Sequence, residues 1–291
     1  SRVHEIDAQE ALKKEISSRE VTIADKTAEA LNNATLAKQF SPQVIKAIAD
    51  GKIKHLHGIQ RHKICVLFID IVNSTERMSR IDKDDLNKVL TMFLEDTTGI
   101  MLKYDLTLDK FLGDGILAFS NSPVQKPDYI ERCLFAVQEI KMKVLSRRNE
   151  YLKFWLNELQ IRAGLAVGYA NVGFYGSDAS FKTFTAIGRV VNLASRLCSV
   201  AEPNQILVSA DVRAIANEHH VFSDMGLRKL KGFEEDIVNV FAYEPQEQTD
   251  GKNLDVPVCP NGHGTLFLDV NDLGIYNLKC RYCDYIASGQ T

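Results

Sequence analysis

Two aspartates stand at positions where a carboxylate suits metal chemistry. Asp70 lies near the end of the apolar run KICVLFIDIV at residues 63–72, and Asp114 lies between two glycines in LDKFLGDGILAF at residues 108–119. Two carboxylates held at neighbouring strand ends form a hard oxygen site that suits Mg²⁺, which leaves its other positions to water and phosphate oxygens. The flanking glycines leave space for a polyphosphate near the backbone. A lone strand-end aspartate is more often a cap or turn residue, so the metal hypothesis rests on the pair.

The elements that must position these acids follow from hydrophobic periodicity. Residues 63–72 predict a strand buried on both faces, and a helix of roughly 25 residues should run from Ser74 or Thr75 to near Lys103. The order strand, helix, two strands, helix, strand, then a helix–strand extension predicts an α+β sheet with helices on one face. The later segments are a hairpin joined by the Gly-Asp-Gly turn, a long helix at 128–156, a glycine-rich strand at 160–176, a helix at 191–200, a strand and short helix at 205–212, and a terminal hairpin at 222–244.

Four motifs carry a resemblance to a known family. They are VLFIDIVNST, LDKFLGDGILAF, IRAGLAVG and FTAIGRVVNLASRL, and in this order and at these separations they resemble the catalytic domain of class III nucleotidyl cyclases, over residues 40–243. The resemblance implies a ferredoxin-like α+β fold with a central, mainly antiparallel sheet. It also implies a dimer with active sites between protomers, and conversion of a nucleoside triphosphate into a 3′,5′-cyclic monophosphate and pyrophosphate.

The resemblance also implies roles for the metal and phosphate ligands. Asp70 and Asp114 match the two metal-binding aspartates, and the backbone carbonyl of Ile71 completes a site for two Mg²⁺ or Mn²⁺ ions. In-line attack of the ribose 3′-hydroxyl on the α-phosphorus would then gain two-metal stabilisation. Arg162 matches the phosphate-binding arginine, whose planar fork suits phosphate oxygens. Without the motif, Arg162 would be an ordinary outward-facing strand residue.

Four further positions match groups that handle the ribose, the transition state and the base. Asn192 and Arg196 lie at i and i+4 on one helix face, where the family orients the ribose and stabilises charge on the α-phosphate. Lys110 and Thr185 match the base-reading pair. Lysine donates to adenine N1, and the threonine hydroxyl, whose rotor suits either direction, can accept from the exocyclic amine. The pair indicates ATP as substrate, in a subclass for which bicarbonate responsiveness is implied.

A homodimer would form two equivalent active sites, because one chain holds every required group. Each site would combine residues of one protomer, Asp70, Asp114 and Arg162, with residues of the other, Lys110, Thr185, Asn192 and Arg196. Lys231 in RKLKGF is a further candidate phosphate contact, with Lys229 as its alternative. The chain departs from the common pattern at Asn73, where glycine is frequent, and at Arg189, where aspartate or asparagine is usual.

The tail carries a second candidate metal site. Cys259 and His263 in CPNGH, and Cys280 and Cys283 in CRYC, form two ligand pairs separated by 16 residues, with strand-like TLFLDV and IYNLKC between them. This resembles a zinc ribbon with a structural Cys₃His site, which a segment with almost no core of its own needs. Three residues rather than two separate the first ligand pair, so a metal-free ribbon is the alternative.

Composition limits which classes of function and which cellular location we expect. The 291 residues carry 35 basic and 38 acidic side chains, a net charge of −3, which argues against a nucleic-acid partner. No apolar stretch is long enough to span a bilayer, and Cys65, Cys133 and Cys198 stand singly in apolar contexts typical of buried free thiols. We therefore expect a cytoplasmic protein. The predicted organisation is a helical transmitter or dimerisation segment at 1–38, the catalytic domain at 39–245, a linker at 246–257 and the ribbon-like tail at 258–291.

Several alternatives stay open at this level. The partner of the helix at 1–38 is the body of the chain, the second protomer or an upstream regulatory module. The same fold could serve another base, giving cyclic UMP or cyclic CMP in anti-phage signalling, or cyclic GMP. A different class is a catalytically silent nucleotide-binding dimerisation module, but such a decayed site should have lost a metal aspartate or Arg196. A polymerase-like palm enzyme would need a nucleic-acid track, which the near-neutral charge does not offer.

Overall fold

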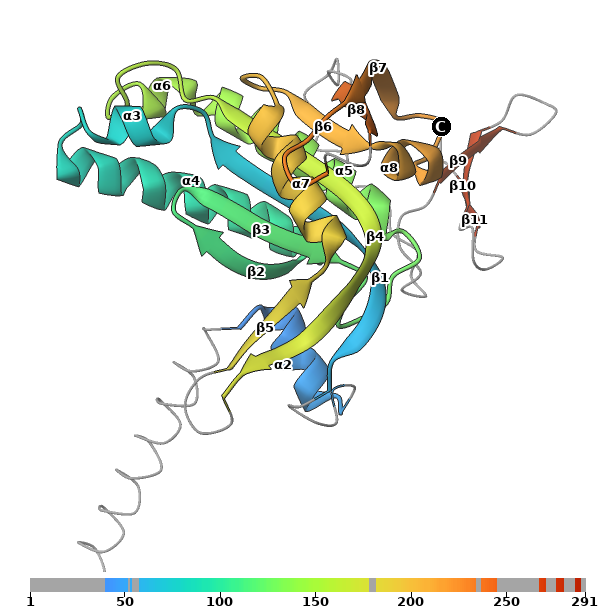
Figure 1. Cartoon of the computed structure of the whole chain (residues 1–291). Coiled ribbons are helices and arrows are strands. Elements are labelled where there is room, and N and C mark those ends of the chain that lie inside the picture. Colours follow the sequence, from blue (N-terminus) through green and yellow to red (C-terminus); the bar gives the residue numbers. More distant parts are fainter. Residues whose placement is uncertain are drawn as a thin grey trace, which may run out of the picture.

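The fold is built on one large sheet (Figure 1). The computed structural model describes residues 40–51, 53, 58–177, 182–233 and 237–244, and the backbone of three short strands between residues 267 and 288. The sheet has eight strands in the order β2-β3-β1-β4-β6-β8-β7, with β5 also paired to β4. Its members are β1 (Gln60–Ile71), β2 (Thr107–Leu112), β3 (Gly115–Ser120), β4 (Ile161–Gly176), β5 (Lys182–Ile187), β6 (Ile206–Ser209), β7 (Val221–Arg228) and β8 (Val238–Glu244).

The predicted fold class is confirmed. Every strand pair of this sheet is antiparallel except β4 with β6, so the sheet is mainly antiparallel. The long strand β4 pairs with β1 along one edge from Ile161 to Val172. Its other edge pairs with β6 near its start and with β5 near its end. β4 therefore organises the centre of the sheet.

Helices cover both faces of the sheet, which corrects the expectation of helices on one face. Strand β1 is buried on both faces, and alternate side chains enter different cores. Leu67 packs in the core beneath α4 (Lys83–Lys103) and α5 (Tyr129–Ser146), whereas Val66 packs in the core beneath α2 (Pro42–Ala49) and α7 (Arg189–Val200). Three short helices complete the described fold: α3 (Ser74–Met78), α6 (Arg148–Tyr151) and α8 (Ala210–Ile215).

Two predicted long helices are each divided. The helix expected from Ser74 to near Lys103 is α3 followed by α4, because the carboxylate of Asp82 caps a new helix by accepting from the Asp84 amide at 2.9 Å. The helix expected at 128–156 ends at Ser146 and is followed by the single turn α6. Strand β5 was not predicted as an element.

A glycine sets the approach of α7 to the sheet. A Cβ added at Gly164 of β4 would lie 2.2 Å from the Ala194 carbonyl oxygen and 2.4 Å from the Cys198 amide nitrogen. Such contacts are far inside van der Waals distance, so only glycine lets the α7 backbone lie this close to β4. The element that lies against this part of the glycine-rich strand is therefore α7.

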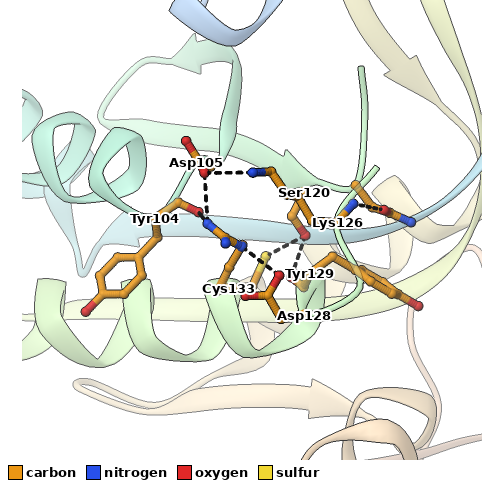
Figure 2. Close-up of polar contacts among 9 residues, drawn as sticks. Tyr104, Asp105, Ser120, Lys126, Asp128, Tyr129 and Cys133 are labelled. Carbon is orange, nitrogen blue, oxygen red and sulfur yellow. Dashed lines mark hydrogen bonds and ion pairs between the residues drawn. The ribbon is translucent and has the colours of Figure 1, made fainter. Parts of the chain in front are cut away.

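The loops around the first turn of α5 are fixed by an ion-pair network (Figure 2). The guanidinium of Arg132 lies 2.9 Å from the carboxylates of both Asp105 and Asp128, and Lys126 lies 3.3 Å from Asp105. Nearby, the Ser120 hydroxyl at the end of β3 donates to the Tyr129 carbonyl at 2.6 Å. The network ties the turn before β2 and the loop after β3 to α5, so it holds the base of the β2–β3 hairpin.

In the tail, β9 (Phe267–Val270), β10 (Tyr276–Lys279) and β11 (Ile286–Ser288) form a separate antiparallel sheet in the order β11-β10-β9. Strands β9 and β10 coincide with the two strand-like segments predicted between the ligand pairs. The candidate ligands Cys259, His263, Cys280 and Cys283, the predicted linker at 246–257 and the predicted helix at 1–38 lie outside the described residues.

Two expectations drawn from composition can be compared with the described residues. Cys65, Cys133 and Cys198 are buried free thiols, as predicted. Among the helices that the structure describes, none combines the length and the apolar character needed to cross a bilayer.

Candidate active site

Asp70, Asp114 and Arg162 form one cluster at the ends of β1, β4 and the β2–β3 hairpin. Asp70 is the direct cross-strand partner of Arg162 in the β1–β4 ladder, and Arg162 Nη2 lies 2.8 Å from Asp70 Oδ2. Asp114 lies in the hairpin turn, where its Oδ2 accepts from the Ile71 amide at 3.2 Å. The register of the sheet thus brings together both predicted metal ligands, the backbone of Ile71 and the predicted phosphate ligand.

The two carboxylates influence each other. Burial raises the pKa of Asp70 above its ordinary value, the neighbouring Asp114 carboxylate raises it further, and Arg162 opposes the rise. A carboxyl such as Asp70, whose ionisation is disfavoured by burial and by a neighbouring acid, marks a site where a divalent cation would be strongly stabilising.

A pocket of about 530 Å³ opens at this cluster. Besides the acids and Arg162, Asn73 and the first turn of α3 line it on one side, and Ser195, Cys198 and Ser199 of α7 on another. Asn73 adopts a left-handed backbone conformation with φ of 54°. Asparagine tolerates this region better than most residues, so it replaces the frequent glycine without loss of the turn.

Helix α7 presents different faces to different surroundings. Val190, Ala194 and Leu197 are buried against the sheet at helical spacing. Ser195 and Ser199 face the pocket just described, and the Ser199 carbonyl accepts from Arg162 Nη1 at 3.3 Å.

Asn192 and Arg196 lie on another side of α7. Asn192 is exposed and Arg196 is half-buried. Neither side chain makes a hydrogen bond or ion pair with another described residue, so both are available to a ligand or a second chain.

A second cluster joins β2 to β5. The Lys110 ammonium donates to Thr185 Oγ1 at 3.0 Å, and Thr185 Oγ1 donates to Asp109 Oδ2 at 2.7 Å. The structure therefore brings the two predicted base-reading residues together, although they are 75 positions apart in sequence. Within the described part of the chain, no hydrogen bond or ion pair links this cluster to Asp70, Asp114 or Arg162.

Lys231 is exposed in the turn after β7. In the same turn Phe233 is buried, and the Arg189 guanidinium lies 4.8 Å from the centre of its ring. Arg189, a departure from the common motif, therefore stacks on an aromatic side chain and ties the start of α7 to this turn. Among the described residues, no hydrogen bond or ion pair joins Lys231 to either cluster.

Sequence reasoning missed Asp109 as a member of the second cluster. Asp109 precedes Lys110, and in a regular strand the two side chains would point to opposite faces. The β2–β3 register shifts between Leu108 and Lys110, so Asp109 is the extra residue of a β-bulge. Because bulges depend on pairing between strands, the sequence gives no local signal of this one.

Comparison with known proteins decides the family. Residues 58–243 match the family described as adenylate and guanylate cyclase catalytic domain. The chain belongs to this family. The match covers well over half of the chain and includes every element that carries the two clusters.

Curated relatives of this cyclase domain include uncharacterized proteins. One from Mycobacterium tuberculosis is 29% identical over 197 residues, which is 66% of this chain and 35% of that protein. One from Rhizobium meliloti is 25% identical over 181 residues, which is 61% of this chain and 17% of that protein. The chain thus spans about a third or less of the curated relatives it matches.

Solved structures with this fold include an adenylyl cyclase and a guanylyl cyclase. The adenylyl cyclase CyaB from P. aeruginosa is 29% identical with a TM-score of 0.63, covering 67% of this chain and all (100%) of that one. The guanylyl cyclase Cya2 is 22% identical with a TM-score of 0.62, covering 67% of this chain and 98% of that one, and at this identity it shows the fold alone.

The first cluster fits the metal chemistry of the family. Class III cyclases use two divalent metal ions, Mg²⁺ or Mn²⁺. The cluster offers two neighbouring carboxylates, and their oxygens are hard donors of the kind these ions prefer.

Proposed function

We propose that this domain is an adenylate cyclase that converts ATP into 3′,5′-cyclic AMP and pyrophosphate at the interface of a homodimer. The observation that carries the proposal is the 3.0 Å hydrogen bond between Lys110 and Thr185, which sets side by side two groups complementary to adenine. Cyclase domains of this family bind a nucleotide and dimerise, and a 29% identical structure is an adenylyl cyclase.

The acid cluster holds the triphosphate end of the substrate. Asp70, Asp114 and the carbonyl of Ile71 would hold two Mg²⁺ or Mn²⁺ ions, which when bound lower the pKa of the ribose 3′-hydroxyl and neutralise phosphate charge. Arg162 exchanges its ion pair with Asp70 for a bidentate contact with phosphate, since a planar guanidinium fits either partner. Lys231 is a further candidate phosphate contact, from an exposed turn.

Asn192 and Arg196 act on the reacting atoms. The 3′-oxygen bonds to the α-phosphorus while the bond to the leaving pyrophosphate breaks, and negative charge builds on the α-phosphate oxygens. Arg196, which has no described partner of its own, stabilises that charge, and Asn192 one turn earlier orients the ribose.

The base is read by Lys110 and Thr185. The Lys110 side chain is 41% exposed and its ammonium donates to adenine N1, while the threonine oxygen faces the exocyclic amine. A guanine-reading site needs an acceptor at the position of Lys110, because guanine presents a donor on that edge.

The two clusters belong to different sites in the dimer. Asp70, Asp114 and Arg162 of one protomer meet Lys110, Thr185, Asn192 and Arg196 of its partner. The unpartnered side chains on α7 support this arrangement, since a second chain would bring them a substrate.

The test is product formation by the purified chain with Mn²⁺ and an equimolar mixture of ATP, GTP, UTP and CTP, read by mass spectrometry. Predominant cyclic AMP is the expected result. A cyclic pyrimidine or cyclic GMP as main product would overturn the base assignment, and absence of any cyclic product would point to a silent nucleotide-binding module.

A further inference from the structure

The direction of the Thr185 hydroxyl is open from sequence, because a threonine O–H can rotate to donate or to accept. A site that donates to the base at this point would favour an oxo group, and one that accepts would favour an amine. The selectivity of the second cluster therefore depends on what holds this single proton.

Asp109 holds it. The side chain of Asp109 is fully buried (0% exposed), and its Oδ2 accepts from Thr185 Oγ1 at 2.7 Å and from the Ala186 amide at 3.2 Å. A carboxylate has no proton to give, so the Thr185 hydroxyl must be the donor in this contact. The Ala186 hydrogen bond holds the same carboxylate oxygen against the backbone of β5.

The β-bulge makes the arrangement possible. In β2 the register shift between Leu108 and Lys110 leaves Asp109 as an extra residue. Bulges re-aim side chains that would otherwise alternate. Consecutive residues Asp109 and Lys110 thus both reach Thr185, one as acceptor and one as donor.

The remaining hydrogen-bonding capacity of Thr185 is then defined. Its O–H donates to Asp109, one lone pair accepts the hydrogen bond from Lys110, and the other lone pair is left to accept from the substrate. Adenine and cytosine present an amino group at the corresponding edge, whereas guanine and uracil present a carbonyl oxygen.

We propose that Asp109 is a specificity-determining positioning residue, which locks the Thr185 hydroxyl as an acceptor toward substrate and so selects amino bases over oxo bases. The inference rests on the proposed function of the second cluster and adds a residue that does not touch the substrate.

The test compares ATP with inosine triphosphate, whose purine carries an oxo group in place of the amine, by kcat/KM for cyclic product with Mn²⁺. In Asp109→Ala the hydroxyl is free to turn, and the ATP-to-inosine-triphosphate ratio should fall by about ten- to a hundredfold. Asp109→Asn keeps an oxygen that can accept from Thr185 and Ala186, so it should hold the ratio near that of the wild type. Asp224→Asn, at an exposed aspartate of β7, is the matched control.

A purely structural role for Asp109 would lower both activities together and leave the ratio unchanged, and that result would overturn the inference. If Asp109→Ala does not fold, Asp109→Leu, which fills a similar volume but offers no acceptor to Thr185, replaces it and must lower the ratio in the same way. Failure of the proposed function is distinct, since the wild-type chain would then yield no cyclic AMP from ATP.

Discussion

Complementation between two inactive chains tests how the site is divided. Asp114→Ala damages the acid cluster, and Arg196→Ala damages the α7 group that would act on the partner's substrate. Each homodimer should be inactive. In a mixed dimer, however, the intact acid cluster of the Arg196→Ala chain faces the intact α7 of the Asp114→Ala chain, which restores one site of the two.

The magnitude follows from symmetry. With equal amounts and random pairing, half of the dimers are mixed and each has one working site, so activity should return to about a quarter of wild type if that site turns over at its wild-type rate. Isolating the mixed dimer with two different affinity tags should raise this to about one half. The assay is cyclic AMP formation by co-expressed chains, measured against each variant alone.

The matched control pairs Asp114→Ala with Asp70→Ala. Both changes fall in the acid cluster, so every site in that mixture lacks one acid and no activity should return. Equal recovery in the two mixtures would refute the division of the site. So would absence of recovery with Arg196→Ala, because a site contained within one chain cannot be complemented.

Three further variants probe metal binding, packing and pH. Asp114→Ala alone should lower the rate with Mn²⁺ about a thousandfold or more, while the thermal midpoint stays near wild type because the carboxylate is half-buried in a turn; unchanged turnover would exclude it as a metal ligand. Gly164→Ala should cost about 1–3 kcal/mol in urea unfolding, because its Cβ would meet the backbone of α7 at Ala194; unchanged stability would show that α7 is free to move. Glu131→Gln should cost about 3–5 kcal/mol, since Glu131 lies 2.5 Å from buried His220. Although burial alone raises the pKa of Glu131, the hydrogen bond from His220 brings it below its ordinary value of 4.5. This stability is therefore present above about pH 4.5 and is lost as pH falls through the lower folded pKa; equal acid sensitivity of the two proteins in pH-dependent unfolding would contradict the assignment.

The sequence is most informative where chemistry and local pattern coincide. The acid at the end of β1 and the acid in the Gly-Asp-Gly turn are readable because an apolar run and a tight turn each leave a local signal. The division of the long helix before β2 was also readable in principle, because Asp82 is a standard capping residue. It was missed because the apolar pattern continues across the break.

The pairing of strands across the sheet could not be predicted from the sequence. Strand β5 is short, and its place beside β4 depends on contacts far along the chain. The bulge at Asp109 exists only in the β2–β3 register. The position of α7 on the second face depends on the absence of a side chain at Gly164, which in sequence looks like any other glycine of a strand.

Helix α7 has one more consequence. Its serine face lines the pocket of its own protomer, where the Ser199 carbonyl accepts from Arg162, while Asn192 and Arg196 are the residues proposed to act on the partner's substrate. In the proposed dimer, nucleotide binding at one site would draw Arg162 away from the last turn of the helix that serves the other site. We therefore expect the two sites to be coupled, so that occupancy of one changes the affinity or rate of the other. A plot of turnover against ATP concentration would then depart from a hyperbola, and its Hill coefficient would measure the coupling that α7 carries between the two sites.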